Sequence, residues 1–308
     1  MIGSLFAIFL LAQESPLPTL DVFKEDLWRV FQVWFQTGDL MEGNGPGIEN
    51  GALKNYTYTE TTTLINRDSG GKTRDTETSV HHVILGPEPW QSYRKLISKN
   101  GVPLSAAELE KQDREQKKRE QKRKIEMEKA AREAEKKKAA QQSKPPAPAG
   151  KEDEMFCSPA SCPFNDFVTR VYDIQVVRRE VIDGYATVLI TFKKKAGLKP
   201  KSVDEKFLQH LKLHVWITEK EHEPLRLEVQ LLNPVSFGYG VFGKIQPGSG
   251  GVQERRKIND EVWAPVRVEM SMAGRLLVVK RNQRQITEFS DFKKYRVETR
   301  MNVVPDDR

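Results

Sequence analysis

The stretch that decides the fold is Leu213–Leu231, LHVWITEKEHEPLRLEVQL, in which apolar and polar residues alternate on both sides of a short turn. Leu213, Val215 and Ile217 share one face of the first strand. After the polar segment 219–224, the second strand carries Leu225, Leu227, Val229 and Leu231. A period of two is typical of a strand with one covered and one solvated face. The stretch therefore predicts an antiparallel hairpin with one apolar face.

The same pattern extends over residues 172–292, where short alternating runs are separated by turn residues. Val266, Val268, Met270 and Met272 alternate with polar residues, and Ala273-Gly274 is expected to reverse the chain towards Phe289. Before residue 101, three more strands are expected at 56–65, 76–85 and 91–98, with a turn at Asp68-Ser69-Gly70-Gly71 after the first. The predicted class is α+β, a curved antiparallel sheet with covering helices and a long charged helical insertion.

Residues 20–35 predict an amphipathic helix. Its apolar stripe is Leu20, Phe23, Leu27, Trp28, Phe31 and Trp34, and Glu25 and Asp26 belong to the polar side. Such a stripe can insert into a membrane surface or pack on a sheet. Because membrane-surface helices usually carry a Lys- and Arg-rich polar face, packing on the sheet is favoured.

A charged insertion interrupts the strands at residues 104–144, with 14 Lys and Arg against 9 Asp and Glu. Ser105 and Glu108 form a capping box at its start, and Glu-to-basic pairs four residues apart, such as Glu110 with Arg114, support a single exposed helix. No apolar residue lies between Leu109 and Ile125, so no coiled-coil seam is present. The rest of the chain is nearly neutral, which argues against a nucleic-acid partner.

The N-terminal residues suggest export. An apolar run from Leu5 to Ala12 is followed by polar residues, which resembles a secretory signal and is too short to span a membrane. A buried N-terminal strand is the alternative. In an exported protein Cys157 and Cys162 are expected to form a disulfide. Export to the bacterial periplasm or cell envelope is the prediction.

No catalytic or metal-binding constellation stands out. His81 and His82 are adjacent on one strand and so point to opposite faces, and His210 and His214 fall across a helix end and a strand start. No Ser with a nearby base and no tight carboxylate cluster appears. The expectation is a protein that is not an enzyme, with no cofactor and no metal.

Several segments together resemble a known family. They are Val215-Trp216-Ile217-Thr218, Leu225-Arg226-Leu227-Glu228, Val235 to Gly243, Glu261-Val262-Trp263-Ala264-Pro265 and Phe289-Ser290-Asp291-Phe292-Lys293-Lys294-Tyr295. They look like an uncharacterised exported bacterial branch of the LolA/LolB-like, outer-membrane lipoprotein-sorting superfamily. The resemblance covers roughly residues 20–100 and 165–299. It implies an incomplete antiparallel barrel plugged by helices, with acyl chains as cargo, and transfers no binding residue to this chain.

These observations divide the chain into a signal-like segment at 1–12, a helix and first strands at 17–100, and a charged helix with a Pro-rich linker at 104–155. The remaining strands occupy 156–299, and a tail follows at 300–308. The leading hypothesis is a carrier for an acyl chain, lipid or lipoprotein. Its candidate contacts, for each of which an ordinary core role is the favoured alternative, are Phe23, Trp28, Phe31, Trp216, Met270 and Met272. The alternative is a non-catalytic envelope scaffold that binds a protein partner through residues 104–142.

Overall fold

The computed structural model describes residues 16–27, 30, 53, 56–85, 92–141, 164–237, 243–276 and 279–295. Its helices are η1 (Leu20–Phe23), α3 (Ala106–Gln141), α4 (Phe164–Val171) and α5 (Val203–Leu208). The first strands are β1 (Tyr56–Arg67), β2 (Thr73–Ile84), β3 (Tyr93–Lys99) and β4 (Val102–Pro103). After α3 come β5 (Tyr172–Ile182), β6 (Tyr185–Lys194), β7 (Leu211–Thr218), β8 (Pro224–Leu231), β9 (Val235–Phe237), β10 (Gly243–Ile245), β11 (Gly250–Ile258), β12 (Val262–Leu276) and β13 (Val279–Lys294).

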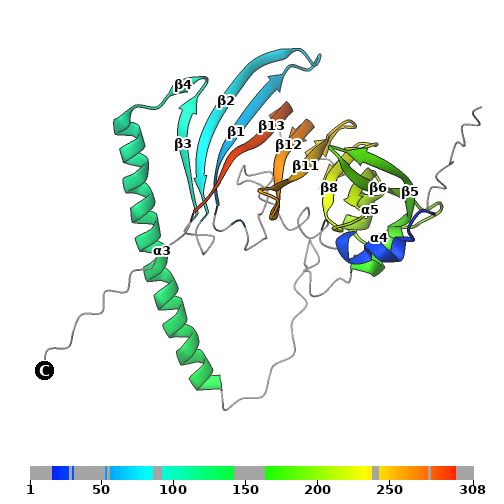
Figure 1. Ribbon diagram of the computed structural model, residues 1–308, viewed down its shortest axis with the longest axis horizontal. Coiled ribbons are helices and arrows are strands. Elements are labelled where there is room, and N and C mark those ends of the chain that lie inside the picture. Colours follow the sequence, from blue (N-terminus) through cyan, green and yellow to red (C-terminus); the bar gives the residue numbers. More distant parts are fainter. Residues whose placement is uncertain are drawn as a thin grey trace, which may run out of the picture.

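All these strands belong to one antiparallel sheet. Its order is β4-β3-β2-β1-β13-β12-β11-β8-β7-β6-β5, with β10 pairing with β12 and β9. The two ends of this order, β4 and β5, do not pair with each other, so the sheet stays open. Figure 1 shows α3 beside the β3–β4 end and α4 and α5 at the opposite end, against β5, β6 and β8. The predicted class, an open antiparallel sheet with a few helices and one long charged helix, is confirmed.

The expected hairpin at residues 213–231 forms with the expected alternation. Leu213 lies opposite Val229 and Val215 opposite Leu227, and all four are buried. We call the face of the sheet that carries these residues the inner face. Lys212, His214 and Trp216 alternate with them and point to the other side, the outer face.

Helices cover the inner face at the β5–β8 end. The main hydrophobic cluster joins Val188 and Ile190 of β6, and the inner residues of β7 and β8, to helical residues. Those helical residues are Phe23, Leu27, Val30, Val168, Val171 and Leu208. The sheet cannot bury this apolar surface by closing on itself, so the helices keep it from water.

An ion pair between a buried Glu205 and a partly exposed Arg170 joins two of the covering helices. Ser202 caps α5 by accepting a hydrogen bond from the Glu205 backbone N–H, and the Glu205 carboxylate accepts one from the Lys201 backbone N–H at 2.6 Å. These two bonds resemble a capping box, except that the Glu205 carboxylate bonds the residue before the cap. The Glu205 side chain is fully buried and also pairs with Arg170 of α4. Glu205 thus satisfies the start of α5 and ties it to α4.

One turn prediction was wrong. Ala273 and Gly274 do not reverse the chain, because β12 continues through them to Leu276 and pairs with β13 along its length. The absence of a side chain at Gly274 serves a close approach instead. A Cβ there would lie 2.5 Å from the Lys244 carbonyl oxygen of β10. The glycine therefore admits a third neighbouring strand.

The charged insertion forms α3, with the predicted capping box at its start. The Ser105 backbone N–H donates to the Glu108 carboxylate at 2.9 Å, and the predicted ion pair of Glu110 with Arg114 has a distance of 3.5 Å. The first turns of α3 are attached to the sheet, which the sequence did not indicate. The Gln112 amide both accepts from the Leu96 N–H and donates to the Leu96 carbonyl, each at 3.0 Å. Gln112 thereby takes the place of a neighbouring strand along the β3 edge.

Several predictions concern residues outside those that the structure describes. They are the signal-like segment 1–12, the linker after residue 141, the disulfide between Cys157 and Cys162, and the tail 300–308. Among the helices that are described, none has the length and apolar character needed to cross a bilayer.

We expect Glu205→Ala to lower the free energy of unfolding by about 3 kcal/mol, because it removes a helix cap and leaves Arg170 without its buried partner. Urea unfolding followed by circular dichroism measures this loss. Lys206→Ala, at the next and exposed position of α5, is the matched control and should change stability by less than about 0.5 kcal/mol. Equal stability of the two variants would contradict this role of Glu205.

Candidate functional site

The candidate site is the inner face at the β5–β8 end together with the N-terminal helix, which consists of η1 and the α-helical residues 24–27. Phe23 and Leu27 are each 1% exposed and pack into the main hydrophobic cluster, as the sequence predicted. Val30 joins them, although the predicted stripe did not include it. This helix therefore covers apolar side chains of the strands with its own.

The polar contact between Asp26 and His222, which we call the clasp, holds the N-terminal helix at the turn between β7 and β8. Asp26 was expected on the solvated side of this helix, but the structure buries it, with His222 Nδ1 2.9 Å from its Oδ2. The His222 ring also lies 5.3 Å from the Phe23 ring, measured between centroids. Arg179 of β5 adds a hydrogen bond from its Nη2 to the Pro16 carbonyl at 3.0 Å. The helix is thus fixed to the sheet by apolar packing and by these polar contacts.

Sequence reasoning missed this clasp because its partners are distant in the chain. Asp26 and His222 are separated by 196 positions, and no local pattern links them. One feature of the backbone distinguishes His222, which has a positive φ of 56°. That conformation is uncommon for a residue with a side chain, and it fits a turn.

The structure does not bring the six predicted lipid contacts together. Phe23 lies in the main cluster, whereas Met270 packs on a separate inner-face cluster of Tyr58, Val83, Val268 and Phe289. Met272 follows on the same face of β12, opposite Gln283. Trp28 and Phe31 lie outside the described residues. Their role in binding stays a prediction.

Trp216 lies on the outer face, away from Phe23. Its indole N–H donates to the Glu180 carboxylate at 2.8 Å, and this bond is the main reason why the pKa of Glu180 is lowered. The Arg226 guanidinium stands over the Trp216 ring at 5.5 Å, and His214 meets the ring edge-on. Since Trp216 alternates with Val215 and Ile217, the period of two already assigns it to this face.

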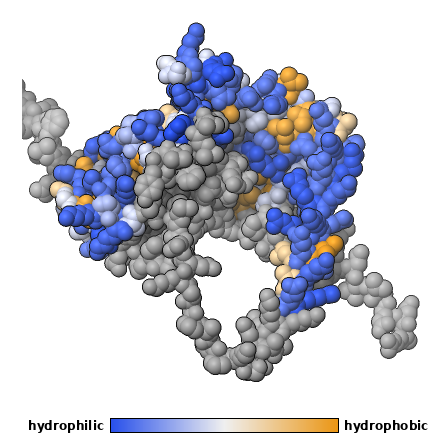
Figure 2. All heavy atoms as spheres, turned by 180° about the vertical axis from the view of Figure 1, so that it is seen from behind, coloured by the Kyte–Doolittle hydropathy of each residue, from blue (hydrophilic) through white to orange (hydrophobic). Residues whose placement is uncertain are grey.

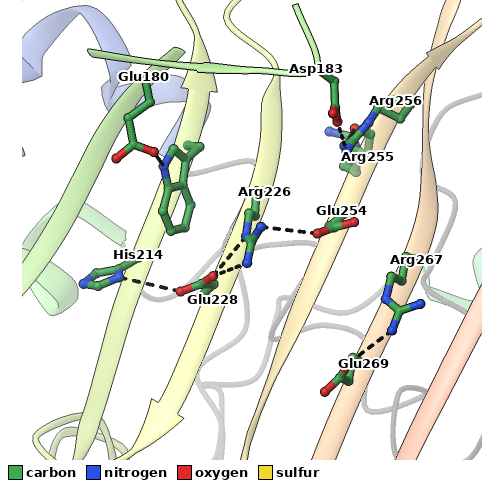
Figure 3. A network of polar contacts seen from close by, with 11 residues as sticks. Glu180, Asp183, His214, Arg226, Glu228, Glu254, Arg255, Arg256, Arg267 and Glu269 are labelled. Carbon is green, nitrogen blue, oxygen red and sulfur yellow. Dashed lines mark hydrogen bonds and ion pairs between the residues drawn. The ribbon is translucent and has the colours of Figure 1, made fainter. Parts of the chain in front are cut away.

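The outer face around Trp216 is charged and solvated. Arg226 pairs with Glu228 and with Glu254, and Glu269 pairs with Arg267 (Figure 3). An open hollow of about 430 Å³ over β5–β8 is lined by Glu180, His214, Trp216, Arg226 and Glu228, among others. Because its charges compensate one another, this surface offers no concentrated charge to a ligand.

The inner face becomes polar towards β1–β3. The Glu60 carboxylate is buried and accepts hydrogen bonds from the Arg94 guanidinium, including one from Nε at 3.0 Å. His81 lies opposite Glu60 in the pairing of β1 with β2, on the inner face, while His82 points outwards. The apolar part of the inner face is therefore richest at the β5–β8 end. No group of His, Cys, Asp and Glu fit to hold a metal occurs among the described residues.

Comparisons with known proteins find similar folds only. No family model and no curated protein matches the chain. A LolA superfamily protein from Nitrosomonas europaea matches with 11% identity over 79% of this chain and 87% of that one, at a TM-score of 0.27. A DUF1329 family protein from Desulfovibrio piger matches with 12% identity over 90% and 94%, at a TM-score of 0.29. A putative outer membrane lipoprotein-sorting protein domain from Vibrio parahaemolyticus matches with 8% identity over 82% and 88%, at 0.26.

The proteins from Nitrosomonas europaea and Vibrio parahaemolyticus carry the family names that the sequence resemblance gave. Their identities to this chain are low, and the TM-scores are too low to align one site with another. The function proposed below therefore depends on residues of this chain.

Burial, reinforced by the Arg94 guanidinium, lowers the pKa of His81 to about 4. Protonation of His81 is therefore less favourable in the folded protein than in the unfolded chain. The contribution of neutral His81 to the free energy of unfolding is complete above about pH 6.5 and decreases as the pH drops towards 4. We expect the free energy of unfolding of His81→Gln to decrease by about 1–2 kcal/mol less than that of the unaltered protein over this pH range. This figure allows for the partial exposure of His81. Urea unfolding at pH 7 and pH 4.5 measures it. The outward-facing His82→Gln is the control, and an identical pH dependence in both variants would contradict the assignment.

Proposed function

We propose that this protein is an exported, non-catalytic carrier that binds the acyl chain of a lipid or lipoprotein. The binding surface is the apolar inner face at the β5–β8 end. The observation that supports this function is the pairing of an open sheet with an N-terminal helix that covers its most apolar part. When that helix lifts, Phe23, Leu27 and Val30 leave the cluster, and the side chains beneath become available to an acyl chain.

The energies of closing and binding are similar in size. Burial of three large apolar side chains contributes about 5–9 kcal/mol to the closed state. About a dozen methylenes of an acyl chain, at roughly 0.8 kcal/mol each, contribute a similar amount when they replace those side chains. An exchange between helix and ligand is therefore feasible without unfolding of the sheet. The clasp of Asp26 with His222 sets how readily the helix opens.

A second candidate function is a non-catalytic scaffold of the cell envelope that binds a protein partner through α3. The exposure of this helix beyond its first turns favours it. The two functions differ in what the sheet does. A carrier binds acyl chains through the sheet whether or not α3 is intact, and a scaffold has no acyl ligand.

We expect delipidated protein to bind a fluorescent fatty acid saturably. His222→Ala should tighten this binding about three- to tenfold, because loss of the clasp raises the fraction of molecules with an open helix. A fluorescence titration measures both affinities. His214→Ala, on the outer face, is the control and should bind like the unaltered protein. Absence of saturable binding would contradict the carrier function, and equal affinities of the two variants would contradict opening at the clasp.

A further inference from the structure

The exposed side of α3 carries a stripe of cations without an acidic residue. At about 100° per residue, one sector of the helix, about 80° wide, holds Lys111, Arg114, Lys118, Lys122, Lys129 and Arg132. All six are exposed, and Ile125 is the apolar residue among them. The acidic residues of α3 fall outside this sector. We call these six cations the basic stripe.

The contacts of α3 with β3 set the direction of the basic stripe. Gln112 bonds the Leu96 backbone, and Asp113 accepts hydrogen bonds from Tyr93 at 2.9 Å and from Lys95 at 2.8 Å. The bonds from Lys95 and Tyr93 also lower the pKa of Asp113, which keeps it ionised. Gln112 and Asp113 lie roughly opposite the basic stripe on the helical wheel. The sheet therefore holds α3 by one side and leaves the stripe facing away from it.

The cations of the stripe are largely available to a partner. Arg114 lies 3.5 Å from Glu110 and Lys122 lies 3.9 Å from Glu126, but all four side chains are more than half exposed. Ion pairs of this kind are weak and exchange readily with other anions. From Lys111 to Arg132 the stripe is on the order of 30 Å long. Figure 2 shows α3 as a mostly hydrophilic arm on the right side of the molecule.

A flat anionic surface fits this stripe better than a helix or a groove does. The stripe has no apolar seam for a partner helix to grip. It is straight, faces away from the sheet and consists mainly of lysines, which attract negative charge without a fixed hydrogen-bond geometry. Anionic phospholipid headgroups present mobile charges in a plane. Each cation near such a surface strengthens the binding about fivefold.

We propose that α3 is a docking arm that lays its basic stripe on a membrane surface rich in anionic phospholipid. The helix stays outside the hydrocarbon region, because it lacks an apolar face to insert. This inference goes beyond the carrier function and does not require it, since the stripe and the inner face of the sheet are separate surfaces. A protein with both would be held at the membrane where lipid is exchanged.

Co-sedimentation of the full chain with vesicles tests the proposal. The vesicles contain three parts phosphatidylcholine to one part phosphatidylglycerol, or phosphatidylcholine alone. We expect binding to the anionic vesicles that weakens as salt is raised, and little binding to the neutral ones. The quadruple variant Lys118→Gln, Lys122→Gln, Lys129→Gln and Arg132→Gln should bind at least about thirtyfold more weakly.

A second quadruple variant removes the same charge from the other sides of α3. It carries Lys117→Gln, Arg119→Gln, Arg123→Gln and Lys124→Gln, all at exposed positions. We expect it to lose less than about fivefold. Circular dichroism checks that both variants keep their helix, which Gln supports well. Equal losses in the two variants, equal binding to both kinds of vesicle, or binding to polyglutamate or duplex DNA without binding to vesicles would each overturn the proposal. Fatty-acid binding by the sheet is measured separately, so the two proposals can fail independently.

Discussion

The structure depends on how an open sheet keeps its apolar inner face from water. A closed barrel would bury that face by itself, but β4 and β5 do not meet, so other elements must cover it. At the β5–β8 end the cover consists of the N-terminal helix, α4 and α5. Two of these are fixed to each other by the ion pair of Glu205 and Arg170. The N-terminal helix is held by packing and by the clasp at His222, and in the proposed function it is the element that opens.

At the opposite end of the sheet, polar contacts attach α3 to β3. There the Gln112 amide satisfies the backbone N–H and carbonyl of Leu96 on β3, and Asp113 accepts hydrogen bonds from Tyr93 and Lys95. A helix with almost no apolar surface can therefore be held in one orientation by hydrogen bonds and an ion pair. The same attachment that protects an edge strand also points the basic stripe outwards. The charged insertion is thus attached to the sheet at its start, and its side chains at positions 121–130 are exposed.

Much of this fold could be predicted from the sequence, because a strand with one buried face has apolar residues at every second position. The hairpin of β7 and β8 and the capping box of Ser105 with Glu108 at the start of α3 followed from local patterns. Features that depend on distant neighbours could not be predicted in this way. Asp26 is buried because His222 lies beside it, and Gly274 is needed because β10 approaches β12 there. The hydrogen bonds of Gln112 to β3 have no local signature either.

The site was predicted less well, and the reason is physical. Aromatic and Met residues were grouped by chemical type, whereas the pleat separates them by position, so Trp216 lies on the face opposite Phe23. The central claim is that the N-terminal helix moves and the sheet does not. Hydrogen–deuterium exchange with and without saturating fatty acid tests it most directly. Faster exchange at residues 20–27 with unchanged protection at Leu213–Ile217 is the expected result. Unchanged or slower exchange at residues 20–27 in the lipid-bound protein would contradict it.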